Sequence, residues 1–200
     1  MLRAALLISL ALLLTGCAIG PQSREARVNY DFGLPRSDKD ASPRLQQDLV
    51  VADISAPAWM DNTGMYYRLA YQDTTRPQAY ALSHWVMSPA ALLTQRLRAN
   101  IVRASKAGVF TPADGVRAGY ALRLELEEFS QVFDTTDKSR AVLRLRASLT
   151  RQRDIVAQQS FSLEHAAATP NAEGGVRALI EASDAAGEKL VDWLAANMKK

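Results

Sequence analysis

The chain has 200 residues, of which 48% are hydrophobic and 22% charged, and its 24 Lys and Arg nearly balance its 21 Asp and Glu. This length and composition predict one globular domain, and the absence of long runs of like charge gives no indication of a nucleic-acid-binding surface. With one cysteine and two histidines in the whole chain, the sequence also predicts no metal site and no bound cofactor.

The first residues have the layout of a secretory signal peptide. Arg3 precedes a mostly apolar run over residues 4–14, which is too short for a membrane-spanning helix of about 20 residues. The sequence Leu-Thr-Gly-Cys at residues 14–17 resembles the lipobox of bacterial lipoproteins. The resemblance implies that residues 1–16 are removed and that Cys17 becomes the first mature residue and carries acyl chains such as palmitate. An ordinary cleaved signal with an incidental cysteine is the alternative.

The residues after Cys17 are expected to form a tether. Residues 18–29 are polar and include a Gly-Pro pair, and fully extended they reach at most about 40 Å. The alternative is that this segment docks on the domain. We therefore divide the chain into a signal peptide (1–16), a lipidated N-terminus and tether (17–29) and one domain (30–200).

Short apolar or alternating runs predict the strands of the first half. They lie at residues 28–34, 49–54, 65–71 and 78–85, and the last two suit an antiparallel pair. Asp53 is the one carboxylate inside an apolar strand. It either caps a turn near Ser55 or belongs to an interface.

Two long helices are predicted. Ser88 and Pro89 suit the start of a helix that runs to about residue 104. Its expected buried stripe is Leu93, Leu97 and Ile101, and its arginines, Arg96, Arg98 and Arg103, lie off this stripe. The second helix is expected over residues 175–197. Gly174 and Gly175 before it predict a flexible helix entry, with an anion site at the helix N-terminus as the alternative.

Between the helices, three alternating segments at residues 120–133, 141–149 and 155–165 predict an antiparallel meander. The alternation slips at residues 127–129, which indicates a bulge. Glu125 and Glu127 would face Arg144 and Arg146, which favours surface ion pairs over catalytic carboxylates. The element order predicts a single α/β domain with a mixed, mostly antiparallel sheet and two long helices packed on it.

Aromatic residues gather between residues 59 and 71. Alternation assigns about half of them to the core, whereas Trp59, in a loop, and Tyr66, on the other face, are candidates for a surface that binds a partner or lipid. Packing in the core is the alternative for both. The chain has no Gly-x-Ser-x-Gly motif and no Gly-rich phosphate loop. We therefore expect no catalytic residues and no enzymatic activity.

Several segments together resemble the family of ABC-type transport auxiliary lipoprotein components, which includes the paraquat-inducible protein C lipoproteins. The matching stretches are the lipobox, Tyr-Asp-Phe-Gly-Leu-Pro at 30–35, Leu-Val-Val-Ala-Asp-Ile-Ser-Ala-Pro at 49–57 and Gly-Gly-Val-Arg-Ala-Leu at 174–179. The resemblance implies an α/β sandwich similar to anticodon-binding-domain-like sheets. It carries no catalytic motif over to this chain, so Cys17 is the one chemically defined site.

The same resemblance implies a periplasm-facing lipoprotein of the outer membrane. Ala18, the second mature residue, is not the aspartate associated with inner-membrane retention. The implied partners are an ATPase, a permease and a mammalian-cell-entry (MCE) domain protein that move lipid between two membranes, and several copies of the chain could form a ring. One alternative is a structural or assembly lipoprotein of the outer membrane without a transport role. Another is a tethered hydrolase, which would need His84 or His165 beside a serine and a carboxylate.

Overall fold

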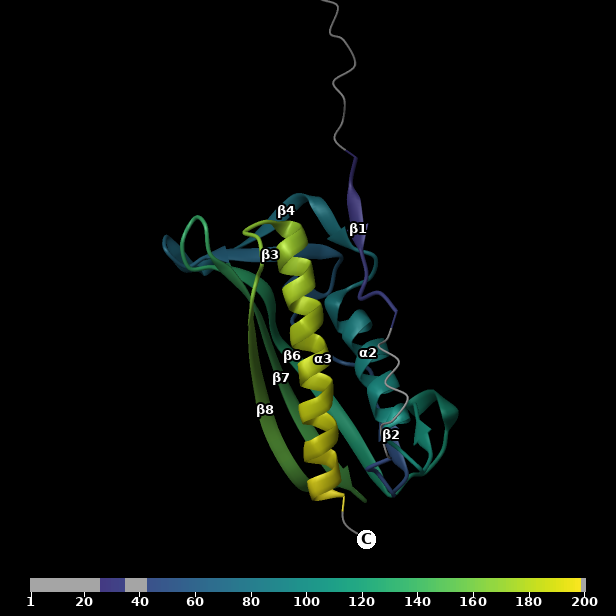
Figure 1. Cartoon of the computed structure of the whole chain (residues 1–200). Coiled ribbons are helices and arrows are strands. Elements are labelled where there is room, and N and C mark those ends of the chain that lie inside the picture. The colour runs from purple at the N-terminus through teal and green to yellow at the C-terminus, as the bar shows by residue number, and fades with distance from the viewer. Residues whose placement is uncertain (1–25, 35–42, 199–200) are drawn as a thin grey trace, which may run out of the picture.

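A mixed sheet of eight strands carries two helices on one of its faces in the computed structural model, which describes residues 26–34 and 43–198 (Figure 1). The strands are β1 (Val28–Tyr30), β2 (Leu49–Val51), β3 (Gly64–Leu69), β4 (Asp73–Trp85), β5 (Val109–Phe110), β6 (Tyr120–Phe133), β7 (Ser139–Arg151) and β8 (Asp154–Ala166). The long helices are α2 (Pro89–Arg103) and α3 (Ala172–Asn197), and the short 3-10 helices are η1 (Ala58–Met60) and η2 (Pro112–Asp114). This is the predicted single α/β domain.

Strand β6 is the centre of the sheet. On one side β7 pairs with it antiparallel along its length, and β8 pairs with β7 at the edge. On the other side β2 runs parallel to its beginning, with Leu49 opposite Tyr120, and β3 runs parallel to its end, with Tyr67 opposite Gln131. β4 lies beside β3 and β1 beside β4, whereas β5 lies beside β2. The chain from β2 to β3 therefore follows the length of β6.

The predicted bulge in β6 is confirmed. Leu126 pairs with Leu145, but the next paired residue is Glu128, opposite Arg144. The skipped residue, Glu127, forms an ion pair of 3.0 Å with Arg146 on the exposed face of the sheet. An exposed pair of this kind contributes less than about 1 kcal/mol, so its main effect is on strand register.

The first strand is shorter than expected. β1 ends at Tyr30 and not at residue 34, because the chain turns at Gly33, whose φ is 63° and whose N–H donates to Asp31 Oδ1 at 2.8 Å. The turn directs Phe32 into the core, where its ring lies 5.7 Å from that of Trp85 and 5.9 Å from that of Phe129. The segment just after the expected tether is therefore anchored by an aromatic side chain.

Helix α2 buries its predicted stripe, but one arginine does not lie where the sequence places it. Arg96 is only 5% exposed, with Nε 3.2 Å from Asp184 Oδ1 on α3. Its guanidinium also donates a hydrogen bond to the carbonyl oxygen of Phe32. Arg96 thus joins both helices to the N-terminal segment, and the prediction that it lies off the buried face is wrong because the buried side of α2 includes its contact with α3.

The two glycines at the start of α3 are sites of close packing. They lie inside the first turn, which Asn171 caps by accepting a hydrogen bond from the Gly174 N–H at 2.9 Å. A Cβ on Gly175 would lie 2.1 Å from Gln131 Oε1. The predicted flexible entry is therefore wrong: the helix approaches β6 so closely that a side chain does not fit.

The side chain of Gln131 is the reason for this tight fit. Its Oε1 accepts from the Tyr80 hydroxyl at 2.8 Å, and its Nε2 donates to Ser139 Oγ at 2.8 Å. Burial, with a smaller effect of the neighbouring Tyr67, raises the pKa of Tyr80 to about 12. The phenol therefore keeps its proton for this bond at neutral pH, and a side chain on Gly175 would displace a buried amide that bonds both Tyr80 and Ser139.

We predict that Gly175→Ala destabilises the domain by about 1–3 kcal/mol, since the added methyl group overpacks the contact between α3 and β6. The measurement is urea unfolding followed by circular dichroism. Gly119→Ala is the matched control, because no atom lies within 4 Å of a Cβ built there. Equal stability of the two variants would contradict the close packing at Gly175.

Candidate functional site: an aromatic and arginine cluster on the open sheet face

The face of the sheet away from the helices carries an ordered group of polar and aromatic side chains, here called the aromatic cluster: Trp59, Asn62, Tyr66, Arg68 and Glu128. Tyr66 and Arg68 are two residues apart on β3 and so point to the same face. The Trp59 ring, from η1, meets the Tyr66 ring edge to face, with centroids 5.2 Å apart. The Arg68 guanidinium carbon lies 5.6 Å from the centroid of the Trp59 ring.

A turn between η1 and β3 holds the cluster. Asn62 Nδ2 donates to the Trp59 carbonyl oxygen at 2.8 Å. Its Oδ1 accepts from the Gly64 N–H at 2.7 Å and from the Tyr66 hydroxyl at 3.1 Å. An asparagine side chain that bonds the backbone two residues later is a common turn device, and here it also orients both aromatic rings.

Beneath the rings lies a shielded ion pair. Arg68 Nη2 donates to Glu128 Oε2 at 2.9 Å, and both side chains are only 17% exposed. Ser130, the next outward-facing residue of β6, is fully buried. Shielding from water strengthens the attraction between the charges but costs hydration free energy. The pair therefore holds the two strands and positions Arg68 against Trp59.

The structure brings the two candidate residues of this region together. Trp59 is 37% exposed and Tyr66 is half-buried, whereas Met65 points into the core, as the alternation predicts. Tyr67 also faces inward, with its ring 4.7 Å from that of Tyr80. Sequence reasoning missed Arg68 and its ion pair with Glu128, although a charged residue within an aromatic strand was a usable signal. Aromatic residues and arginine are the residue types enriched at protein interfaces.

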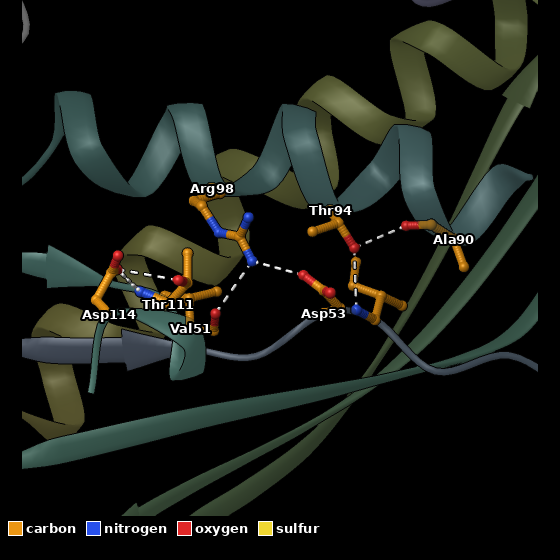
Figure 2. A network of polar contacts seen from close by, with 8 residues as sticks. Val51, Asp53, Ala90, Thr94, Arg98, Thr111 and Asp114 are labelled. Atoms are coloured by element: carbon orange, nitrogen blue, oxygen red, sulfur yellow. Dashed lines mark hydrogen bonds and ion pairs between the residues drawn. The ribbon is translucent and has the colours of Figure 1, made fainter. Parts of the chain in front are cut away.

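Helix α2 fixes the chain that leads from β2 to this cluster (Figure 2). Arg98 Nη2 donates to the Val51 carbonyl oxygen at 3.1 Å and to Asp53 Oδ1 at 2.8 Å. One turn earlier, Thr94 Oγ1 accepts from the Ile54 N–H at 2.9 Å and donates to the Ala90 carbonyl oxygen. These bonds hold residues 51–54 against the helix and so set the start of the segment that carries Trp59.

These contacts also correct the expectation for Asp53. Strand β2 ends at Val51, so Asp53 lies after the strand and not within it. Its exposed carboxylate does not cap a turn at Ser55. It forms an ion pair with Arg98, which lies on the side of α2 that faces this segment.

Near Arg98, Asp114 accepts hydrogen bonds from the Thr111 N–H and hydroxyl. These bonds, with a smaller effect of Arg98, lower the pKa of Asp114.

A groove of about 350 Å³ adjoins the cluster. Ser55, Ala56 and Pro57 form one wall, and Glu125 and Glu127 of β6 lie along the other. The open face thus combines aromatic rings, an apolar loop and carboxylates. This mixture suits contact with another protein better than chemistry on a small substrate, for which convergent reactive groups are needed.

The two histidines were the candidates for the catalytic base of a tethered hydrolase. His165 lines a pocket of about 380 Å³ between α2 and α3, and its Nδ1 lies 3.8 Å from Glu181 Oε2. No serine is among the described residues that line this pocket. His84 is half-buried beside Trp85. Within residues 26–34 and 43–198, no three His, Cys, Asp or Glu side chains gather in a way that could hold a metal ion.

Two expectations concern the membrane. Cys17, the predicted lipidation site, lies outside the described residues. In the part of the chain that the structure covers, no helix combines the length and the apolar character needed to cross a membrane.

Comparisons with known proteins agree with this architecture. The family model for the ABC-type transport auxiliary lipoprotein component matches residues 30–191. The fold is similar to that of a Xanthomonas campestris protein of the DUF330 family, at 19% identity and a TM-score of 0.69, over 86% of this chain and 92% of that one. An uncharacterised protein of known structure matches at 14% identity and a TM-score of 0.66, over 85% and 99% of the two chains. No curated protein sequence matches the chain.

The exposure of Trp59 has a spectroscopic consequence. Of the three tryptophans, Trp85 is 2% and Trp193 is 9% exposed, whereas Trp59 is 37% exposed. We predict that Trp59→Phe removes most of the fluorescence that acrylamide quenches and shifts the emission maximum to shorter wavelength. Trp193→Phe is the control and leaves the quenchable fraction in place. Unchanged quenching in Trp59→Phe would mean that the ring is not on the surface.

Proposed function

The chain belongs to the family of ABC-type transport auxiliary lipoprotein components, and we propose that it is a lipid-anchored, non-enzymatic accessory of a system that transports phospholipid between two bacterial membranes. The observation that carries the proposal is the family match over residues 30–191, directly downstream of the lipobox at residues 14–17. The domain would act by binding partner proteins at the periplasmic face of the outer membrane.

The anchor defines where the domain can act. Cys17 carries the acyl chains, and more than one chain is needed for stable attachment, because a single chain binds only marginally. Residues 18–27 separate it from Val28, the first residue of β1, which pairs with Ser83 of β4. Fully extended, this stretch spans about 35 Å. The body is therefore held close to the bilayer, and its partners must approach it there.

The aromatic cluster is the surface that we assign to a partner. Trp59 is its exposed ring, Tyr66 is half-buried beside it, and the ion pair between Arg68 and Glu128 keeps the rings in place before a partner arrives. Preorganised aromatic residues lose little conformational entropy on binding. The proposed partner is an MCE-domain protein that works with an ABC permease and its ATPase. Several copies of the chain, arranged as a ring, would surround the end of the conduit that such a protein forms.

The anchor is tested by Cys17→Ser in the full-length protein. We predict that the variant moves from the membrane pellet to the soluble fraction after cell lysis and that mass spectrometry finds acyl chains on Cys17 of the wild type. Cys17 is the only cysteine, so no second thiol can substitute for it. A variant that stays in the pellet after washing with high salt would contradict lipid anchoring at this residue.

The partner is tested by affinity capture from membranes solubilised in mild detergent, with the full-length protein tagged at its C-terminus. We predict that the wild type captures an MCE-domain protein and that the double variant Trp59→Ala, Tyr66→Ala captures it at least about tenfold less, as expected for two central aromatic contacts.

Tyr71→Ala is the control for this capture. Tyr71 is similarly exposed but lies in the turn after β3, outside the aromatic cluster. Urea unfolding of all variants distinguishes loss of binding from loss of structure. Capture that survives the double variant would rule out the cluster as the contact, and the absence of any transport component from the wild-type sample would contradict the proposed function.

A further inference from the structure

A second groove lies on the open face at the end of the sheet opposite to the tether. This distal groove has a volume of about 590 Å³ and lies between the start of β6, the end of β7 and the start of β8. At this end Tyr120 lies beside β2, whereas the other end of β6, at Phe133, lies beside β3. At about 3.3 Å per residue the two ends of β6 are about 40 Å apart, and β1 lies at the far one (Figure 1).

Arginines dominate the charge of the distal groove. Arg123 and Arg153 line it, and Glu125 is the one acidic residue among the described residues that line it. Neither arginine forms an ion pair with another residue in the described ranges. Glu125 lies opposite Arg146 in the ladder, although Arg146 forms its ion pair with Glu127, and the exposed Asp154 follows Arg153 in the turn. The two lining arginines outnumber the one lining carboxylate, so positive charge without an ionic partner among the described residues is left for a ligand.

The turn that carries Arg153 is strained. Gln152 has a φ of 56° and Arg153 a φ of 101°, and no other non-glycine residue of the described ranges has a positive φ. Hairpin turns with this geometry favour Asn-Gly, because glycine adopts positive φ without steric cost. Strain of this kind persists where the side chain is needed for another purpose. The chain keeps a long basic side chain at a position where glycine would stabilise the hairpin.

An exposed apolar side chain completes the groove. Ile155, on its wall, is 64% exposed. On the floor, Gln158 Nε2 donates to Ser148 Oγ at 2.9 Å. Arginine beside exposed apolar residues is the mixture found in contacts between proteins.

We propose that the distal groove binds an acidic segment of a protein partner of the transport system; this inference rests on the proposed function and on the anchor at Cys17. The positive charge selects carboxylates, and the exposed Ile155 favours a polypeptide over a small anion. Because the tether joins the domain at β1, the groove lies at the end of the domain farther from the proposed anchor (Figure 1). It is distinct from the aromatic cluster, so one partner could contact both.

The first test measures binding of a fluorescent peptide of ten glutamates to the full-length protein in detergent. We expect that the double variant Arg123→Glu, Arg153→Glu binds it at least about tenfold more weakly than the wild type. Arg76→Glu, Arg144→Glu is the matched control, since it makes the same change of charge at exposed residues outside the groove. Equal weakening in both double variants would show an effect of net charge only and would overturn the proposal.

A second variant separates a functional from a structural role of Arg153. Arg153→Gly relieves the backbone strain, so we expect the urea midpoint of unfolding to rise while peptide affinity falls. A purely structural residue would not change the two quantities in opposite directions. A lower midpoint, or unchanged affinity in Arg153→Gly, would count against the inference.

Two further measurements identify the occupant. If lipid headgroups are the ligand of the groove, vesicles of phosphatidylglycerol compete for it. Binding of these vesicles that depends on Arg123 and Arg153, without peptide binding, would overturn the proposal.

Capture of the MCE-domain protein should fall in Arg123→Glu, Arg153→Glu while membrane attachment stays normal. If the wild type captures no such protein but binds the peptide, the proposed function fails and the acidic specificity of the groove stands.

Discussion

The pairing of β6 on both of its sides is the constraint on which the rest of the fold depends. One side is occupied by a continuous partner, β7, and the other by two short parallel strands, β2 and β3, joined by a loop. Both short strands run in the same direction as β6, β2 beside its beginning and β3 beside its end, so the chain between them continues along β6. The segment between β2 and β3 therefore lies alongside the middle of β6, where Ser55 bridges to Glu125, and it carries η1 with Trp59.

The helices determine which face stays open. Arg96 joins α2 to α3 and to the carbonyl of Phe32, and Gly175 lets α3 approach β6 closely. Because both helices pack on one face of the sheet, hydrophobic residues fill that face. The opposite face carries ion pairs, arginines and exposed aromatic rings. A sheet covered on one face only is common for antiparallel strands. Here it provides the area on which both the aromatic cluster and the distal groove lie.

The two surfaces differ in how they are built. In the aromatic cluster the charge of Arg68 is neutralised by Glu128, so the cluster offers oriented rings and little net charge. In the distal groove Arg123 and Arg153 have no ionic partner among the described residues, and the backbone of Arg153 is strained. The first arrangement favours apolar contact and the second favours carboxylates. Together they fit an accessory protein that binds its partners through surfaces and not through an enclosed site.

Local patterns in the chain were enough for the strands of the meander, the bulge at Glu127 and the extent of α2, because side-chain alternation and helix caps depend on neighbouring residues. They did not predict the burial of Arg96, the ion pair of Asp53 or the close packing at Gly175. The burial of Arg96 depends on α3, the partner of Asp53 is a helix 45 residues away, and the tight fit at Gly175 depends on Gln131. The aromatic residues were visible in the sequence, but their meeting with Glu128 arose only from packing, since the pairing of β3 with β6 joins residues that no local periodicity relates.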